Sequence, residues 1–150
     1  MIIEFDFPAY PNEAMSVPES KRAEGELKVI TKSRELTART LRICSNEKHF
    51  PKRLRWCFTS HICKECNEML SAIIKANSVY VLTEEDAQLR IRYWREALAF
   101  SSSFAMYIDL AMEMAEVKLD TIRSWRVELE EVRNLIRSRI NSETKRYRCG

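Results

Sequence analysis

The chain has 150 residues, a length typical of one domain built around a single core. Only two residues are glycine and four are proline, which excludes a turn-rich β sandwich or barrel and any glycine-rich phosphate loop. No apolar run approaches the roughly 20 residues that a membrane span needs, and no signal peptide is visible. Five cysteines are an odd number for such a chain, so we expect a reduced, cytoplasmic protein.

The net charge of +3 is unevenly distributed along the chain. Residues 1–25 hold five acidic and two basic side chains, so the remainder carries +6. Positive charge concentrates in residues 48–64, with five basic side chains and no acid, and in residues 133–150, with six against one glutamate. Such clusters indicate either a polyanionic partner or a solubilising surface, and the charge alone leaves both open.

Three regions are expected along the chain. Residues 1–25 are expected to form an acidic, proline-containing tail, because prolines oppose a helix there. Residues 26–145 are expected to form helices, and residues 146–150 a short basic tail. The chain is expected to fray from about Asn141 onward.

The first predicted helix spans about residues 26–47. Its apolar stripe has a 4, 3 spacing and consists of Val29, Ser33, Leu36, Thr40 and Ile43. Phe50-Pro51-Lys52 ends it, and Pro51 suits the first turn of a second helix over about residues 52–81. The stripe of that second helix consists of Phe58, Ile62, Cys66, Met69, Ile73, Ala76 and Tyr80.

The third predicted helix spans about residues 84–115 and starts at the N-cap Thr83, which three acidic residues follow. It carries two apolar stripes, although one bundle core needs only about a 3/7 face. The first stripe consists of Ala87, Ile91, Trp94, Leu98, Ser101, Ala105, Ile108, Met112 and Ala115. The second stripe therefore predicts either an oligomer interface or a helix central to a wide core. The candidate interface residues are Tyr93, Phe100, Phe104, Tyr107 and Met114.

The fourth predicted helix starts at an N-cap at Asp120 or Thr121. Its apolar seam consists of Ile122, Trp125, Leu129, Val132 and Ile136. Four long helices joined by short links predict an all-α fold, an up-down-up-down four-helix bundle.

Charged side chains also recur at helical spacing, over residues 28–42 and residues 123–137. Arginines in these stripes can bind phosphate in a forked geometry or pair with a neighbouring helix, and the sequence leaves both open. Trp56 beside Arg55, and Tyr147 beside Arg148, are candidates to stack on unpaired bases. The candidate nucleic-acid-binding residues are Lys52, Arg53, Arg55, Arg123, Arg126, Arg133, Arg137, Lys145 and Arg146.

Cys63-x-x-Cys66 is the pattern with metal or redox character. A structural zinc site needs four ligands, usually as two such pairs, and no thioredoxin-like strand precedes this pair. Cys66 falls on a core position, so packing is favoured over a metal or redox role. The two histidines belong to no catalytic motif, so we expect a non-enzymatic protein without metal or cofactor.

The order of these features resembles a known family. A first amphipathic helix ends in Phe50-Pro51-Lys52-Arg53, and the third helix carries Tyr93-Trp94-Arg95. Over about residues 26–145 this is similar to the four-helix-bundle family of proteins encoded in ribosomal RNA intervening sequences. That family also includes the accessory variability determinant of diversity-generating retroelements.

The resemblance implies a homopentameric barrel with a basic surface. It implies a non-enzymatic accessory factor that binds a reverse transcriptase and template RNA, and so supports mutagenic complementary DNA synthesis. The intervening-sequence relatives have no settled biochemical role. A protein of that type, or a protein-interaction scaffold with no polymerase partner, is therefore the alternative.

Overall fold

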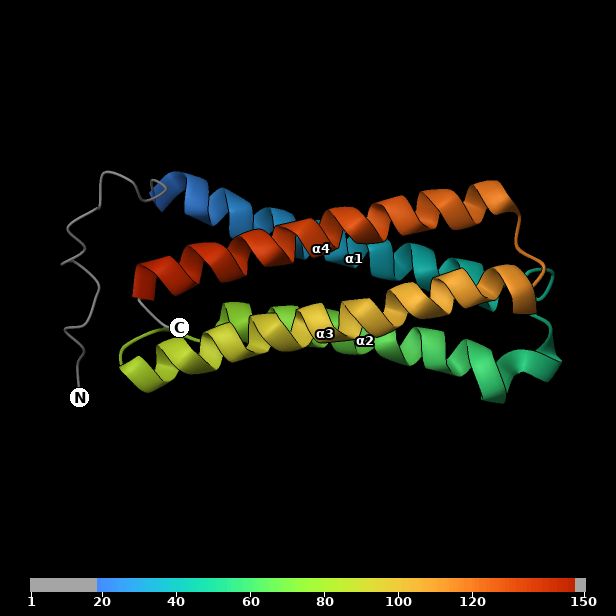
Figure 1. Ribbon diagram of the computed structural model, residues 1–150, viewed down its shortest axis with the longest axis horizontal. Helices are drawn as coiled ribbons and strands as arrows, with labels where there is room; N and C mark the ends of the chain where they lie inside the picture. Colours follow the sequence, from blue (N-terminus) through green and yellow to red (C-terminus); the bar gives the residue numbers. More distant parts are fainter. Residues whose placement is uncertain (1–18, 148–150) are drawn as a thin grey trace.

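The computed structural model describes residues 19–147, and all regular structure in that range is helical. Four long helices run side by side along the molecule, and each is antiparallel to the one before it (Figure 1). They are α1 (Glu19–Ser45), α2 (Ser60–Ser78), α3 (Glu84–Met114) and α4 (Leu119–Tyr147). The prediction of an all-α, up-down-up-down four-helix bundle is confirmed.

The predicted apolar seams form most of the core. Every seam residue predicted on α1 and on α4 is buried, and Trp94 and Trp125 are fully enclosed. Three outer members of the predicted stripes are exceptions: Tyr80 follows the end of α2 and is 80% exposed, and Met112 and Met114 lie near the end of α3 and are exposed. A stripe thus loses its contacts where the helices end, because no neighbouring helix remains to cover it.

Several helix boundaries differ from the prediction: α1 ends at Ser45, α2 ends at Ser78, and α4 begins at Leu119, before its predicted N-cap. α1 begins at Glu19, so residues 19–25 are helical although they were assigned to the tail; residues 1–18 lie outside the described residues. α4 continues to Tyr147 and does not fray from Asn141, because Glu143 and Tyr147 are buried against the other helices. Residues 148–150 also lie outside the described residues.

The entry into α2 is not a regular α-helix. A short 3₁₀ helix, η2 (Lys52–Leu54), leads into a turn of π-helix, η3 (Arg55–Thr59), before α2 begins. Leu54 and Phe58 are buried and anchor this segment to the core. Its basic residues Lys52, Arg53 and Arg55 are consequently held on the outside of the bundle. A π-turn of this kind is rare and often lies at a functional site.

The start of α3 is fixed by a capping box. The Thr83 side chain accepts a hydrogen bond from the backbone N–H of Asp86, at 3.1 Å. The Asp86 carboxylate in turn accepts from the backbone N–H groups of Leu82 and Thr83, both at 3.0 Å. These bonds satisfy donors that the helix itself leaves free, and they confirm Thr83 as the predicted N-cap. No helix within residues 19–147 has the length and apolar character to cross a membrane.

Candidate nucleic-acid interface

The segment that precedes α2 forms the most accessible group of basic side chains among the predicted site residues. We call Lys52, Arg53, Arg55 and Trp56 the basic corner. All four are exposed, and the Trp56 side chain is 81% exposed. Lys52 Nζ lies 3.6 Å from Glu47 Oε1, and no acidic side chain of the described residues pairs with Arg53 or Arg55. The corner therefore combines free guanidinium groups with an exposed indole ring.

On α4, two of the predicted arginines are bound within the protein. Arg126 and Arg133 both donate to Glu130 Oε1, at 2.7 and 3.0 Å. Arg126 Nε also donates to Asp109 Oδ1 on α3, at 2.9 Å, and Arg133 donates to Ser101 and Ser102. Arg126 and Arg133 therefore pair within the bundle, as one of the two readings of the charged stripe expected. Their contacts to Asp109, Ser101 and Ser102 join α4 to α3.

The two arginines change the pKa of the Glu130 carboxyl group. Partial burial raises the pKa of its carboxyl group, but the Arg133 and Arg126 guanidinium groups outweigh that effect. Its pKa is therefore below the ordinary value, and the carboxylate stays ionised at neutral pH. On α1, Arg39 is bound in the same way, because its Nη1 donates to Glu128 Oε2 on α4 at 2.8 Å.

The remaining candidates on α4 are more accessible but are not gathered in one place. Arg123 and Arg137 are exposed, and Arg137 donates to Asn134 at 2.9 Å. Lys145 and Arg146 lie near the end of α4, at the opposite end of the bundle from the basic corner (Figure 1). Arg146 lies over the Tyr147 ring, at 5.3 Å from its centroid. Tyr147 itself is buried, so its predicted stacking on bases is wrong.

The candidate oligomer interface is largely used within the monomer. Phe104 is fully buried and packs edge-on against Trp125, with ring centroids 6.1 Å apart. Tyr107 packs between Phe58 and His61, at 6.1 and 6.2 Å. Phe104 has no surface to offer a partner, because its ring is fully buried in the core of the monomer. Tyr93 and Phe100 are half-buried against this core, and Met114 is exposed.

The sequence analysis missed an ionic cluster, which consists of half-buried Glu26 and the buried residues Arg90, Arg139 and Glu143. Arg90 Nε donates to Glu143 Oε1 at 2.6 Å, and Arg90 Nη2 donates to Glu26 Oε1 at 2.7 Å. Arg139 Nη2 reaches both carboxylates, at 3.1 and 3.2 Å. Two arginines and two glutamates balance in charge, which reduces the cost of burying them.

Further hydrogen bonds connect this cluster to its surroundings. Arg90 Nη1 donates to the carbonyl oxygens of Ala76 and Val79, at 3.1 and 3.2 Å, and so caps the end of α2. Trp94 Nε1 donates to Glu143 Oε2 at 2.9 Å. Burial lowers the pKa of Arg90, but Glu143 and Glu26 raise it by more, so the guanidinium remains charged. The cluster thereby binds all four helices together at one end of the bundle.

A signal for the cluster was present in the spacing. The seam of α4 ends at Ile136 in the apolar pattern, but the same 3, 4 steps lead on to Arg139 and Glu143. On α3, Arg90 falls between the seam residues Ala87 and Trp94 at the same steps. Charged residues at core-facing positions of a helix predict buried ion pairs, provided that both acidic and basic residues occupy such positions.

These features define a four-helix bundle with a basic corner at one end and an ionic cluster at the other. Comparisons with protein-family models, with curated proteins and with solved structures find no match. Among the described residues, no three His, Cys, Asp or Glu side chains are arranged to hold a metal ion.

Proposed function

We propose that this protein is a non-enzymatic accessory factor that binds RNA through its basic corner and presents it to a reverse transcriptase. The exposed and unpaired guanidinium groups of Arg53 and Arg55, next to the exposed ring of Trp56, carry this proposal. The reverse transcriptase of a diversity-generating retroelement is the polymerase that the family resemblance suggests.

The chemistry of the corner suits a single-stranded or looped RNA. Arginine forms paired hydrogen bonds with phosphate oxygens, and an exposed indole ring stacks on an unpaired base. Leu54 and Phe58 anchor the segment from inside, so the corner needs little ordering when it binds.

A homopentamer would strengthen such binding. Five copies would bring about +30 together outside their N-terminal tails, since each copy carries +6 there. The contact that we propose for this assembly is the row of exposed apolar side chains on α3, at Met106, Leu110 and Met114. Their spacing of four places them on one face of the helix.

Binding to a structured RNA across a salt series tests the proposal. The Arg53→Glu, Arg55→Glu double variant should bind more weakly and should lower the slope of log K against log salt by about two. Trp56→Ala should weaken binding about 10-fold or more, with little change in that slope. Binding by the double variant that equals the wild type would contradict the proposal.

The matched control reverses two charges elsewhere. Lys28 and Arg34 are exposed on α1, so Lys28→Glu, Arg34→Glu changes the net charge equally without touching the corner. A loss of affinity as large as that of the corner variant would indicate a diffuse charge effect and no defined site.

A protein-interaction scaffold without a polymerase partner is the second candidate. The pairing of Arg126 and Arg133 within the bundle favours it, because it removes two of the predicted phosphate ligands from α4. Co-purification separates the two candidates: the accessory factor should retain a reverse transcriptase encoded beside its gene, and the scaffold should not.

A further inference from the structure

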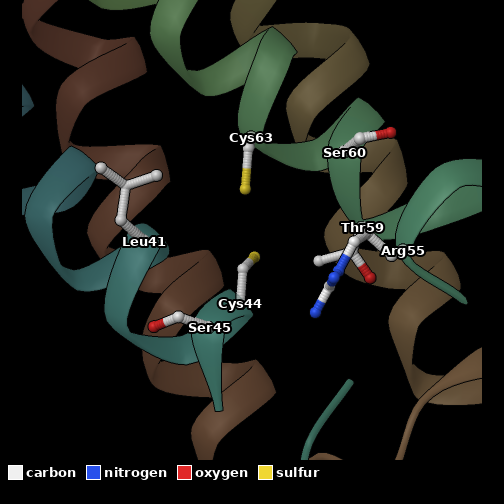
Figure 2. Close-up of a pocket in the computed structure, with 7 residues that line it drawn as sticks. All are labelled: Leu41, Cys44, Ser45, Arg55, Thr59, Ser60 and Cys63. Atoms are coloured by element: carbon white, nitrogen blue, oxygen red, sulfur yellow. The ribbon is translucent and has the colours of Figure 1, made fainter. Parts of the chain in front are cut away.

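A pocket of about 380 Å³ lies between the end of α1 and the beginning of α2. Figure 2 shows Leu41 and Cys44 of α1 on one side of it, with Arg55 and Cys63 across from them. The complete lining is Leu41, Cys44, Ser45, Arg55, Thr59, Ser60 and Cys63. Of the residues in this lining, only Arg55 takes part in the proposed RNA contacts.

Two thiols face each other across this pocket. The sulfur atoms of Cys44 and Cys63 point toward one another from different helices (Figure 2). The interaction with the Cys44 side chain lowers the pKa of the Cys63 thiol to about 7, although burial opposes this. The same interaction, together with burial, raises the pKa of Cys44. At neutral pH about half of Cys63 is therefore present as the thiolate, while Cys44 keeps its proton.

The other cysteines of the described residues lack this arrangement. Cys66 is fully buried, its thiol is bonded to Thr37 Oγ1 at 3.6 Å, and burial raises its pKa to about 11. Cys57 is exposed, and its thiol reaches only backbone carbonyl oxygens, at 3.8 and 3.9 Å. The Cys63-x-x-Cys66 spacing is therefore misleading, because the partner of Cys63 comes from the preceding helix.

We propose that Cys63 is a peroxide-reactive thiol and that Cys44 is its resolving partner, so that a hydroperoxide closes a disulfide between α1 and α2. The Cys63 thiolate attacks one oxygen of the peroxide, the O–O bond breaks, and the second oxygen leaves with a proton as water or an alcohol. Cys63 becomes a sulfenic acid.

The second step forms the cross-link. The Cys44 sulfur attacks the Cys63 sulfur, the S–O bond breaks, and hydroxide leaves with the Cys44 proton as water. In total, two thiols are oxidised by two electrons and one peroxide is reduced. The disulfide joins the last turn of α1 to the first turns of α2 beside Arg55, which belongs to the basic corner. The proposal does not depend on RNA binding.

The test uses the full chain with Cys57→Ser and Cys149→Ser, which leaves Cys44, Cys63 and Cys66. After treatment with hydrogen peroxide, alkylation of the denatured protein and mass mapping should show Cys44 linked to Cys63 and Cys66 still free. Further replacement of Cys44 by Ser should stop the reaction at a Cys63 sulfenic acid that dimedone traps. Cys66→Ser is the matched control and should leave the cross-link unchanged.

Reactivity provides an independent measurement on the chain with all its cysteines. Alkylation of Cys63 should reach half of its maximal rate near pH 7, whereas an ordinary thiol does so near about pH 8.5. A disulfide between Cys63 and Cys66, or a Cys63 that peroxide oxidises no faster than Cys57, would overturn the proposal. Circular dichroism of each serine variant verifies that the bundle is folded.

Discussion

Arg90 on α3 and Glu143 on α4 form a doubly hydrogen-bonded ion pair inside the bundle. The Nε–Oε1 distance is 2.6 Å and the Nη2–Oε2 distance is 3.2 Å, and Glu143 is only 1% exposed. Glu143 has almost no access to bulk water that could replace a missing partner. Its stability therefore depends on both residues being present.

Replacement of Glu143 by Gln should destabilise the protein strongly. The variant leaves the buried Arg90 and Arg139 facing a neutral amide, and loss of one partner from a buried pair costs about 3–5 kcal/mol. The free energy of unfolding in urea measures this cost. Glu130→Gln on the same helix is the matched control. Glu130 is more exposed, so its loss should cost about 0–1 kcal/mol. Equal losses in the two variants would contradict a special role for the ionic cluster.

Asp86 should make stability depend on acid pH. Hydrogen bonds from the backbone of Leu82 and then Thr83 lower its pKa below the ordinary 3.8 in the folded chain. A carboxyl group with a lowered pKa stabilises the fold above its unfolded value, and this contribution is lost as the pH falls through the folded value.

Asp86→Asn should therefore lower Tm at pH 7, and the difference from the wild type should shrink as the pH falls below about 4. Thermal unfolding at several pH values measures it. Glu85→Gln removes an equal charge from the same turn and should leave the pH profile nearly unchanged, since no capping bond involves Glu85. A difference that stays constant down to pH 2 would count against this account.

The hydrogen bond from Trp125 Nε1 to Thr40 Oγ1 should be worth a measurable part of the stability. Its length is 2.9 Å and both side chains are fully buried. Thr40→Val keeps the shape but leaves the indole N–H unsatisfied, which costs about 1–3 kcal/mol. Thr31→Val on the exposed face of α1 is the control, and it should change the free energy of unfolding by less than about 0.5 kcal/mol.

Substitutions at Phe104 and Met114 should have different effects, because Phe104 lies in the core and Met114 on the proposed contact surface. Phe104→Ala removes a fully buried ring and should cost about 3–5 kcal/mol of unfolding free energy. Met114→Ala should leave the stability of the monomer within about 0.5 kcal/mol and should weaken any self-association. Sedimentation at several concentrations, with chemical unfolding, measures both effects. A large loss of monomer stability in Met114→Ala would contradict the assignment of Met114 to the surface.

Much of the fold could be predicted because helical periodicity reports burial directly. The seam from Ile122 to Ile136 and the N-cap at Thr83 are local patterns with one physical explanation each. The turn of π-helix at residues 55–59 has no such pattern, since buried Leu54 and Phe58 are four residues apart, a spacing that a regular α-helix would bury equally well. The two stripes of α3 could not be ranked from the sequence, because only the packing decides which face lies inside.

Pairing between distant residues was equally beyond the sequence. The ends of α1, α3 and α4 supply Glu26, Arg90 and Glu143, and only the folded arrangement shows that they meet. The same holds for Cys44 and Cys63, whose closeness depends on how α1 and α2 pack. Of the predicted site residues, those in the basic corner are exposed because their sequence neighbours Leu54 and Phe58 are buried in the core. Arg126 and Arg133 were instead bound by acids on their own and neighbouring helices.

The ionic cluster also restricts how the helices can align. Apolar seams made of similar residues tolerate a shift of one helix along another, because leucine-sized side chains can exchange places. A shift of α4 by one turn would move Glu143 about 5.4 Å away from Arg90 and would leave charges buried without partners. The cluster thus selects a single register for the whole bundle, and this register determines where along the molecule every other surface residue is displayed.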